Sequence, residues 1–160
     1  QQIIEHSNVT RYDVKNAAQM YDKTVECFEN CDIAILSAAV ADYTPKSTFN
    51  TKLKKKTDNL VVELVPTKDI LAELGKRKKE NQILVGFALE TDNELENAKE
   101  KLLRKKLDCI VLNSLNDAGA GFNVPTNKVT ILDAKGNIYN SDLKSKYEVA
   151  LDISEKILNL

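Results

Sequence analysis

Four features of this sequence could together bind a polyanionic ligand such as a nucleoside triphosphate. Lysine supplies five of the eleven residues between positions 46 and 56, and this cationic segment could close over phosphate groups as a lid. Lys101 and Lys105 are four residues apart, so they share one face if their segment is helical. Phe87 could stack on a base, and Asp42 supplies a carboxylate beside a run of small side chains.

Each of these features also has a simpler interpretation. A lysine run is usually a solvated surface, and the face that carries Lys101 and Lys105 could simply meet water. Phe87 could fill the core, and Glu90 could cap the helix that follows it rather than orient a ligand. The choice depends on whether the fold brings these residues to one place.

A predicted strand, Ile33 to Ser37, positions the first of them. This apolar run contains no Gly, Pro or charge, which is typical of a strand buried on both faces of a parallel sheet. The small side chains that follow would let a ligand approach the backbone closely. In open α/β sheets ligands bind beyond the carboxyl ends of the strands. We therefore expect one rim formed by three strand ends, at residues 37–42, 87–90 and 113.

The rest of the chain alternates between helical and strand patterns. We expect helices from Asp13 or Asn16 to Phe28, from a Thr67 cap to Gly75, and at 94–106 and 146–158. We expect strands at 59–65, 82–89 and 108–112, and a hairpin formed by 127–133 and 138–140. This order predicts an α/β, Rossmann-like fold: a mostly parallel sheet with helices on both faces and an antiparallel hairpin at one edge. The start of the Thr67 helix should offer backbone N–H groups to an anion.

Composition narrows the class of protein. The 160 residues suit one domain, and the net charge of −1 gives no overall field for nucleic-acid binding. No apolar stretch reaches the roughly 18 residues of a membrane-spanning helix. The three cysteines form no disulfide framework, which indicates reduced thiols in a cytoplasmic protein. With His6 as the single histidine, we predict no metal site built by the protein alone.

The common nucleotide signatures are absent, but a longer set of motifs is present. In order these are Ala38-Ala-Val-Ala-Asp-Tyr-Thr-Pro, Lys52-Leu-Lys-Lys, Asp69-Ile-Leu, Gly86-Phe-Ala-Leu-Glu-Thr, Ala98-x-x-Lys101-x-x-x-Lys105-x-x-Asp108, Asn113 and Gly121-Phe-Asn. From Val9 onward the chain resembles the phosphopantothenoylcysteine synthetase (phosphopantothenate–cysteine ligase) domain of coenzyme A biosynthesis. In most bacteria that domain is the C-terminal half of a bifunctional protein with a flavin-dependent decarboxylase, so FMN would belong to the other half.

The resemblance implies a CTP-dependent ligase that uses Mg²⁺. The carboxylate of 4′-phosphopantothenate would attack the α-phosphate of CTP to give an acyl-cytidylate, and the amine of cysteine would then displace CMP. The family is dimeric, with part of the lysine segment near the subunit contact. CTP serves the bacterial family and ATP its eukaryotic branch.

The resemblance also implies which residues bind the nucleotide. Lys52 would act in catalysis by neutralising the acyl-phosphate intermediate, and Leu36 would contribute only its backbone. The full set of matching positions is Leu36, Ala38, Asp42, Lys52, Val65, Pro66, Thr67, Lys68, Phe87, Lys101 and Lys105.

The sequence departs from the family at its start. The family opens this domain with a strand, a Gly-rich turn and an Asn- and Arg-bearing segment that holds phosphopantothenate, and residues 1–160 lack them. We expect a single nucleotide-binding ligase domain that could bind nucleotide without completing the reaction. Thr44 stands where the family often has Arg, and Pro66 is shifted within its motif. Two other classes stay open: an NAD(P)-binding oxidoreductase fragment and a non-catalytic α/β nucleotide-binding module.

Overall fold

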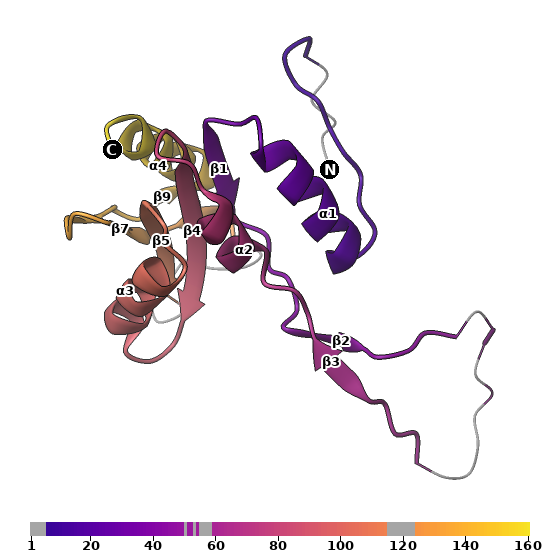
Figure 1. Cartoon of the computed structure of the whole chain (residues 1–160). Helices are drawn as coiled ribbons and strands as arrows, with labels where there is room; N and C mark the ends of the chain where they lie inside the picture. Colours follow the sequence, from indigo (N-terminus) through magenta and orange to yellow (C-terminus); the bar gives the residue numbers. More distant parts are fainter. Residues whose placement is uncertain (1–5, 50, 53, 55–58, 115–123) are drawn as a thin grey trace.

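A five-stranded sheet in the order β1-β4-β5-β7-β8 forms the centre of the molecule (Figure 1). The computed structural model describes residues 6–49, 51, 52, 54, 59–114 and 124–160. Three neighbouring strands are parallel: β1 (Ile33–Leu36), β4 (Ile83–Glu90) and β5 (Cys109–Ser114). Two antiparallel strands complete the sheet, β7 (Val129–Asp133) and β8 (Ile138–Asn140). The predicted α/β Rossmann-like fold and its edge hairpin are confirmed.

Helices cover both faces of this sheet, as expected. The helices α1 (Ala17–Phe28), α2 (Ile70–Arg77) and α3 (Glu94–Arg104) pack on one face around Leu74, Leu84 and Ile110. The helix α4 (Lys146–Leu158) packs on the other face through Val149, Ile153 and Ile157. None of the helices in the described ranges is long and apolar enough to cross a bilayer.

The helices α1 and α2 both begin at a residue whose side chain caps the helix, but the predicted cap of α2 is wrong. Asn16 caps α1 and accepts a hydrogen bond from the Gln19 amide, as one of the two expected caps. The cap of α2 is Asp69 rather than Thr67, because the Asp69 carboxylate accepts from the Ala72 amide. Gly75 does not end α2, which continues to Arg77.

The prediction that the first strand is buried on both faces is also wrong. The side chains of Ile33 and Ile35 are 37% and 49% exposed, while Ala34 and Leu36 pack against the core beneath α1 and α2. β1 lies at the edge of the described sheet, and Ile33 and Ile35 on its other face belong to neither hydrophobic cluster.

A two-stranded ribbon, which we call the arm, projects from the body (Figure 1). It consists of β2 (Tyr43–Pro45) paired antiparallel with β3 (Leu64–Pro66) and of the described residues between them. The sequence predicted a strand at 59–65, but β3 includes only the last two of these residues and ends at Pro66. It predicted no strand at 43–45. A second short ribbon joins β6 (Thr126–Asn127) to β9 (Lys144–Ser145).

Gly75 allows α2 to touch the end of α3. A Cβ atom at this position would lie 1.9 Å from the backbone oxygen of Lys105, which is shorter than any real contact. The absence of a side chain at Gly75 therefore sets how closely the two helices approach.

The thiols should differ sharply in reactivity. Cys109 is fully buried in β5, and burial raises the pKa of its thiol to about 12. At pH 8 only about one Cys109 in ten thousand is then a thiolate, the form that reacts. We expect iodoacetamide at pH 8 to alkylate the exposed Cys27, whereas Cys109 should react only in denaturant, as followed by peptide mass mapping. Labelling of Cys109 in the folded chain as fast as Cys27 would contradict this burial.

Candidate functional site

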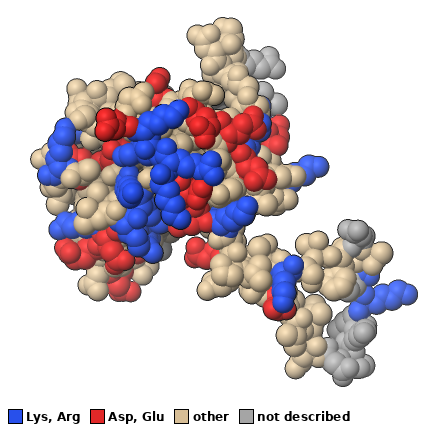
Figure 2. Space-filling model, in the orientation of Figure 1, with Lys and Arg blue, Asp and Glu red and all other residues tan. Residues whose placement is uncertain are grey.

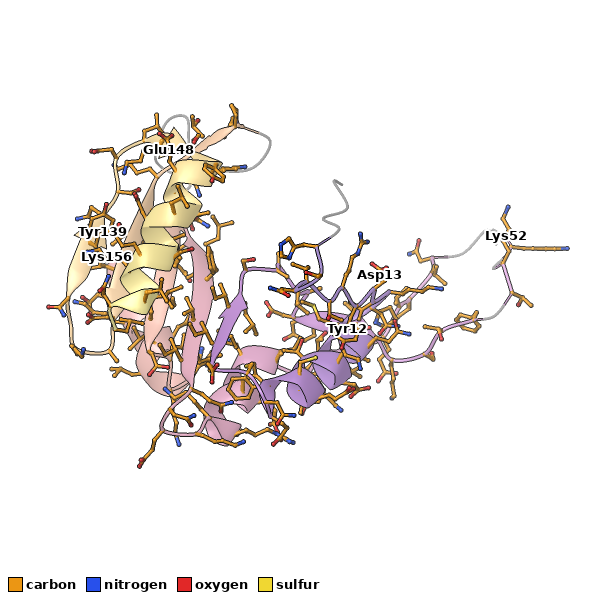
Figure 3. The ribbon with its side chains drawn as sticks, turned by 90° about the horizontal axis from the view of Figure 1, so that it is seen from above. Tyr12, Asp13, Lys52, Tyr139, Glu148 and Lys156 are labelled. Carbon is orange, nitrogen blue, oxygen red and sulfur yellow. The ribbon has the colours of Figure 1, made fainter. Side chains whose placement is uncertain are left out.

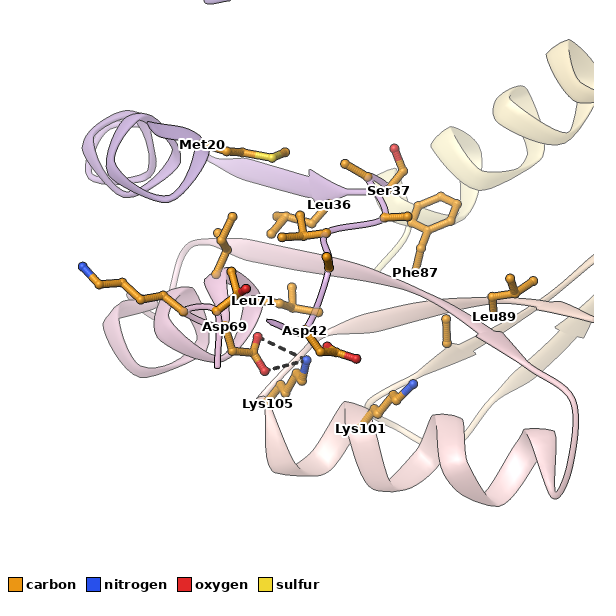
Figure 4. Close-up of a pocket in the computed structure, with 18 of the residues that line it drawn as sticks. Met20, Leu36, Ser37, Asp42, Asp69, Leu71, Phe87, Leu89, Lys101 and Lys105 are labelled. Atoms are coloured by element: carbon orange, nitrogen blue, oxygen red, sulfur yellow. Dashed lines mark hydrogen bonds and ion pairs between the residues drawn. The ribbon is translucent and has the colours of Figure 1, made fainter. Parts of the chain in front are cut away.

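A pocket of about 430 Å³ lies beyond the carboxyl ends of β1, β4 and β5, at the predicted rim (Figure 4). This volume suits a small-molecule ligand. The pocket is lined by Met20, Leu36, Ser37, Ala38, Ala39, Val40, Ala41, Asp42, Thr67, Lys68, Asp69, Ile70, Leu71, Phe87, Ala88, Leu89, Lys101, Lys105 and Asn113. Eight of the eleven residues that the sequence assigned to a nucleotide site are therefore brought together.

The segment after β1 forms one wall through its backbone and small side chains. It runs from Ser37 to Asp42 along the pocket, as the small residues predicted. The amide of Thr67 donates to the carbonyl of Asp42 over 2.8 Å, which fixes the end of this segment against the entrance to α2. A ligand can therefore approach the backbone here without meeting a large side chain.

The start of α2 forms a second wall, but its electrostatics differ from the expected anion site. The Asp69 carboxylate lies at the helix N-terminus and forms an ion pair with Lys105, with 2.9 Å between Oδ2 and Nζ. Partial burial raises the pKa of Asp69, but the Ala72 amide and Lys105 outweigh it and hold this pKa below its usual value. The positive end of α2 thus already faces the protein's own carboxylate.

Thr67 supplies a polar atom that is free to meet a ligand. Its hydroxyl oxygen Oγ1 is buried, and no hydrogen-bond partner for it exists among the residues that the structure describes. A buried hydroxyl without a partner is costly, so this atom suits a ligand donor or acceptor in the pocket.

The third wall is α3, which presents Lys101 and Lys105 to the pocket from successive turns (Figure 4). Neither lysine meets only water: Lys105 pairs with Asp69, and Lys101 pairs with Glu90 at the end of β4. More Lys and Arg side chains gather over α2 and α3, bordered by acidic groups (Figure 2). Of the two interpretations of Glu90, the one in which it caps the next helix does not hold, because the cap of α3 is Asn93.

Phe87 and Asn113 complete the strand ends at the rim. Phe87 lines the pocket and also packs against the core under α4, so both interpretations of its ring hold in part. The Asn113 side-chain oxygen accepts a hydrogen bond from Asn127 over 2.9 Å. This bond holds one polar side chain in place in the pocket lining.

Three of the expected site residues lie outside the pocket lining. Val65 and Pro66 are in β3, where they pair with Thr44 and Tyr43. Lys52 is exposed on the arm, far from the body of the molecule (Figure 3). Within the lysine-rich segment, Lys46 is paired with Glu63, whereas Lys55 and Lys56 fall outside the described residues.

Sequence reasoning named Asp69 and Glu90 but missed that they form ion pairs with the two pocket lysines. Asp69 lies 36 residues from Lys105, and Glu90 lies 11 residues from Lys101, so no local spacing marks either pair. Met20 and Leu71 also line the pocket, and their inward helical positions were the one signal available. Among the described residues, no group of three His, Cys, Asp or Glu side chains could hold a metal ion.

The strand order, the two helix layers and the pocket beyond the parallel strand ends define a Rossmann-like α/β domain with a pocket of a size that suits a small molecule. More narrowly, the chain belongs to the family of the DNA/pantothenate metabolism flavoprotein C-terminal domain, whose model matches residues 1–160. The resemblance to the phosphopantothenoylcysteine synthetase domain is thereby confirmed.

Known relatives carry two different names. A cysteine/cysteine sulfinic acid decarboxylase from an unknown prokaryotic organism is 59% identical over 92% of this chain and 41% of its own length. The coenzyme A biosynthesis bifunctional protein CoaBC of Bacillus subtilis (strain 168) is 44% identical over 92% of this chain and 36% of its own length. The chain thus spans about two fifths of each relative.

A solved structure supports the same family. The crystal structure of the C-terminal domain of coenzyme A biosynthesis bifunctional protein CoaBC matches with a TM-score of 0.77 and 34% sequence identity. The match covers 97% of this chain and 67% of that chain. The similarity therefore includes the whole pocket-bearing fold rather than a part of it.

Proposed function

We propose that this chain is the nucleotide-binding part of a phosphopantothenate–cysteine ligase that acts in coenzyme A biosynthesis. The observation that carries the proposal is the convergence of Asp42, Phe87, Lys101 and Lys105 on one pocket at the ends of three parallel strands. The CoaBC relatives support the same role.

The proposed reaction has two steps on one nucleotide, CTP. A carboxylate oxygen of 4′-phosphopantothenate attacks the α-phosphorus, and pyrophosphate leaves. The amine of cysteine then attacks the acyl carbon, CMP leaves, and an amide bond forms. The barrier in both steps comes largely from alignment and from negative charge on phosphate, which positioned cations and hydrogen-bond donors lower.

Lys101 and Lys105 are suited to bind nucleotide oxygens without leaving their carboxylate partners. An ammonium group has three N–H donors, and the ion pairs with Glu90 and Asp69 do not use all of them. Each lysine can therefore donate to a phosphate or base oxygen and keep its present contact.

Magnesium would enter with the nucleotide. Mg²⁺ in such sites is bound by one or two carboxylates and by substrate phosphates. The pocket lining contains two carboxylates, and Asp69 is already paired with Lys105. Asp42 is therefore the side chain that fits the ion, and Mg²⁺ would offset phosphate charge there.

The arm would form part of the contact between two copies of the chain in a homodimer. Its described residues expose large apolar side chains, with Tyr43 60%, Val61 88% and Val62 54% exposed. A second copy of the chain could cover them, and the family to which the chain belongs is expected to be dimeric. Fusion to a flavin-dependent decarboxylase, with FMN in that partner, is part of the same proposal.

CTP with Mg²⁺ should stabilise the chain more than NADPH does. A ligand that binds only the folded state, at a free concentration of 100 times its Kd, adds about 2.7 kcal/mol to the free energy of unfolding. For a chain of this size, that raises the melting temperature by roughly 5 to 10 °C. Differential scanning fluorimetry with CTP, ATP, NADPH and buffer measures this. A larger shift with NADPH would favour the oxidoreductase alternative.

The decarboxylase activity that the name of one relative states can be tested separately. That name describes a protein of which this chain covers 41%, so it does not assign an activity to this part. Release of carbon dioxide from cysteine or cysteine sulfinic acid by the isolated chain, with no response to CTP, would overturn the ligase proposal.

A further inference from the structure

Glu90 is held in one orientation by the fold around it. Its backbone is paired with Ser114 of β5 at the end of the sheet, and its side chain is 14% exposed. The Asn97 side chain donates to Oε2 of Glu90 over 3.3 Å and to the Asp92 carbonyl over 2.8 Å. The other carboxylate oxygen, Oε1, accepts from the ammonium of Lys101.

The Glu90 carboxylate does not cap the N-terminus of α3. The cap residue is Asn93, which has no capping hydrogen bond from its side chain, and Glu94 and Glu96 supply the negative charge of the first turn. The contacts that the structure gives the Glu90 carboxylate go instead to Asn97 and Lys101. Because Asn97 and Lys101 are one helical turn apart, both side chains reach the Glu90 carboxylate from the same side of α3.

Lys101 needs such a partner if it is to bind a ligand well. A lysine side chain has four flexible carbons and loses considerable rotamer freedom when its ammonium is fixed. Glu90 fixes it before a ligand arrives, so this entropy is lost on folding rather than on binding. The ammonium still has donors left for a ligand in the pocket that Lys101 lines.

We propose that Glu90, braced by Asn97, is a positioning residue that orders Lys101 for nucleotide binding. The inference rests on the proposed nucleotide function of the pocket and gives a role to Glu90, which is not among the eleven predicted nucleotide-binding residues. It assigns Glu90 no contact with the nucleotide itself.

Whether replacement of Glu90 weakens or strengthens nucleotide binding distinguishes this positioning role from simple charge repulsion. A carboxylate near a triphosphate repels it, so removal of the charge alone should strengthen binding. Loss of a positioning residue should instead weaken binding, because Lys101 must then be ordered by the ligand.

A double-mutant cycle tests the inference. The variants Glu90→Ala, Lys101→Met and the double variant are titrated with CTP and Mg²⁺ by calorimetry. We expect each single change to raise the Kd about tenfold, the size of one charged hydrogen bond. The double variant should bind like Lys101→Met alone, because Glu90 acts only through Lys101.

Two further variants keep the result interpretable. Glu96→Ala is the control: like Glu90→Ala, it removes one negative charge and breaks one ion pair with a lysine of α3, here Lys99. The Glu96 side chain does not line the pocket, so this change should leave the Kd for CTP unchanged. Glu90→Gln keeps the shape and one acceptor oxygen, so it should give an intermediate Kd, and it replaces the Ala variant if that fails to fold.

Unchanged or tighter CTP binding by both Glu90 variants, or additive effects in the cycle, would overturn the positioning role. A wild-type chain that binds no CTP would overturn the proposed function together with this inference. Weaker binding by Glu96→Ala to the same extent as Glu90→Ala would also reject it, since the effect would then be one of general charge.

Discussion

Gly75→Ala should destabilise the fold by about 3 kcal/mol, at the upper end of the range for overpacked sites. The added Cβ would lie 1.9 Å from the Lys105 carbonyl oxygen, and backbone atoms on both sides of this contact cannot rotate away. Helix propensity alone predicts the opposite sign, because Ala stabilises a helix interior by about 1 kcal/mol relative to Gly. The sign of the measured change therefore separates packing from propensity.

Urea unfolding followed by circular dichroism gives the free energy of unfolding for this comparison. Lys76→Ala is the matched control: it changes the next residue of α2, which is exposed, and should shift stability by less than about 0.5 kcal/mol. The Gly75 variant should also bind CTP less well, because movement of the Lys105 backbone moves its ammonium. Stability equal to wild type would mean that α2 and α3 can separate at little cost.

Lys52→Gln should lower turnover by on the order of 100-fold when it is tested in a complete phosphopantothenate–cysteine ligase, as for loss of one donor to a developing anion. CTP affinity should change little. The expected reason is that Lys52 acts on the acyl-cytidylate, so its loss raises the barrier more than it weakens nucleotide binding. The arm carries Lys52 away from the pocket in the described structure, so this role requires the arm to approach a pocket during the reaction.

Pyrophosphate release and phosphopantothenoylcysteine formation, measured separately, check this prediction. Lys54→Gln removes an equal charge two residues further along the arm and serves as the control. Near-normal rates of both steps in the Lys52 variant would show that the lysine-rich segment is an ordinary solvated surface. An equal loss in both variants would indicate a general effect of charge instead.

The features of this fold that depend on periodicity could be predicted from the sequence. The alternation of strands and helices placed the carboxyl ends of β1, β4 and β5 at one edge, and the i, i+4 spacing placed Lys101 and Lys105 on one face. Asn16 was an expected cap because its polar side chain directly precedes an apolar helical pattern.

The features that failed depend on contacts between distant residues. Thr67 and Asp69 are both good capping residues, and only the tertiary position of α2 selects Asp69. Tyr43–Pro45 is too short to read as a strand and exists only because Leu64–Pro66 lies beside it. The exposure of Ile35 depends on which elements cover an edge strand, and its apolar character says nothing of that.

The hydrogen bond between Thr67 and Asp42 means that the arm leaves and rejoins the body at one point. The closure entropy of such an excursion grows only slowly with its length, by about 0.6 kcal/mol for each doubling. The length of the arm and its number of charged residues can therefore change during evolution while the pocket at its base keeps its shape. The shape of the pocket is in this sense independent of the length of the arm, although the proposed roles of the arm in dimerisation and in catalysis are not.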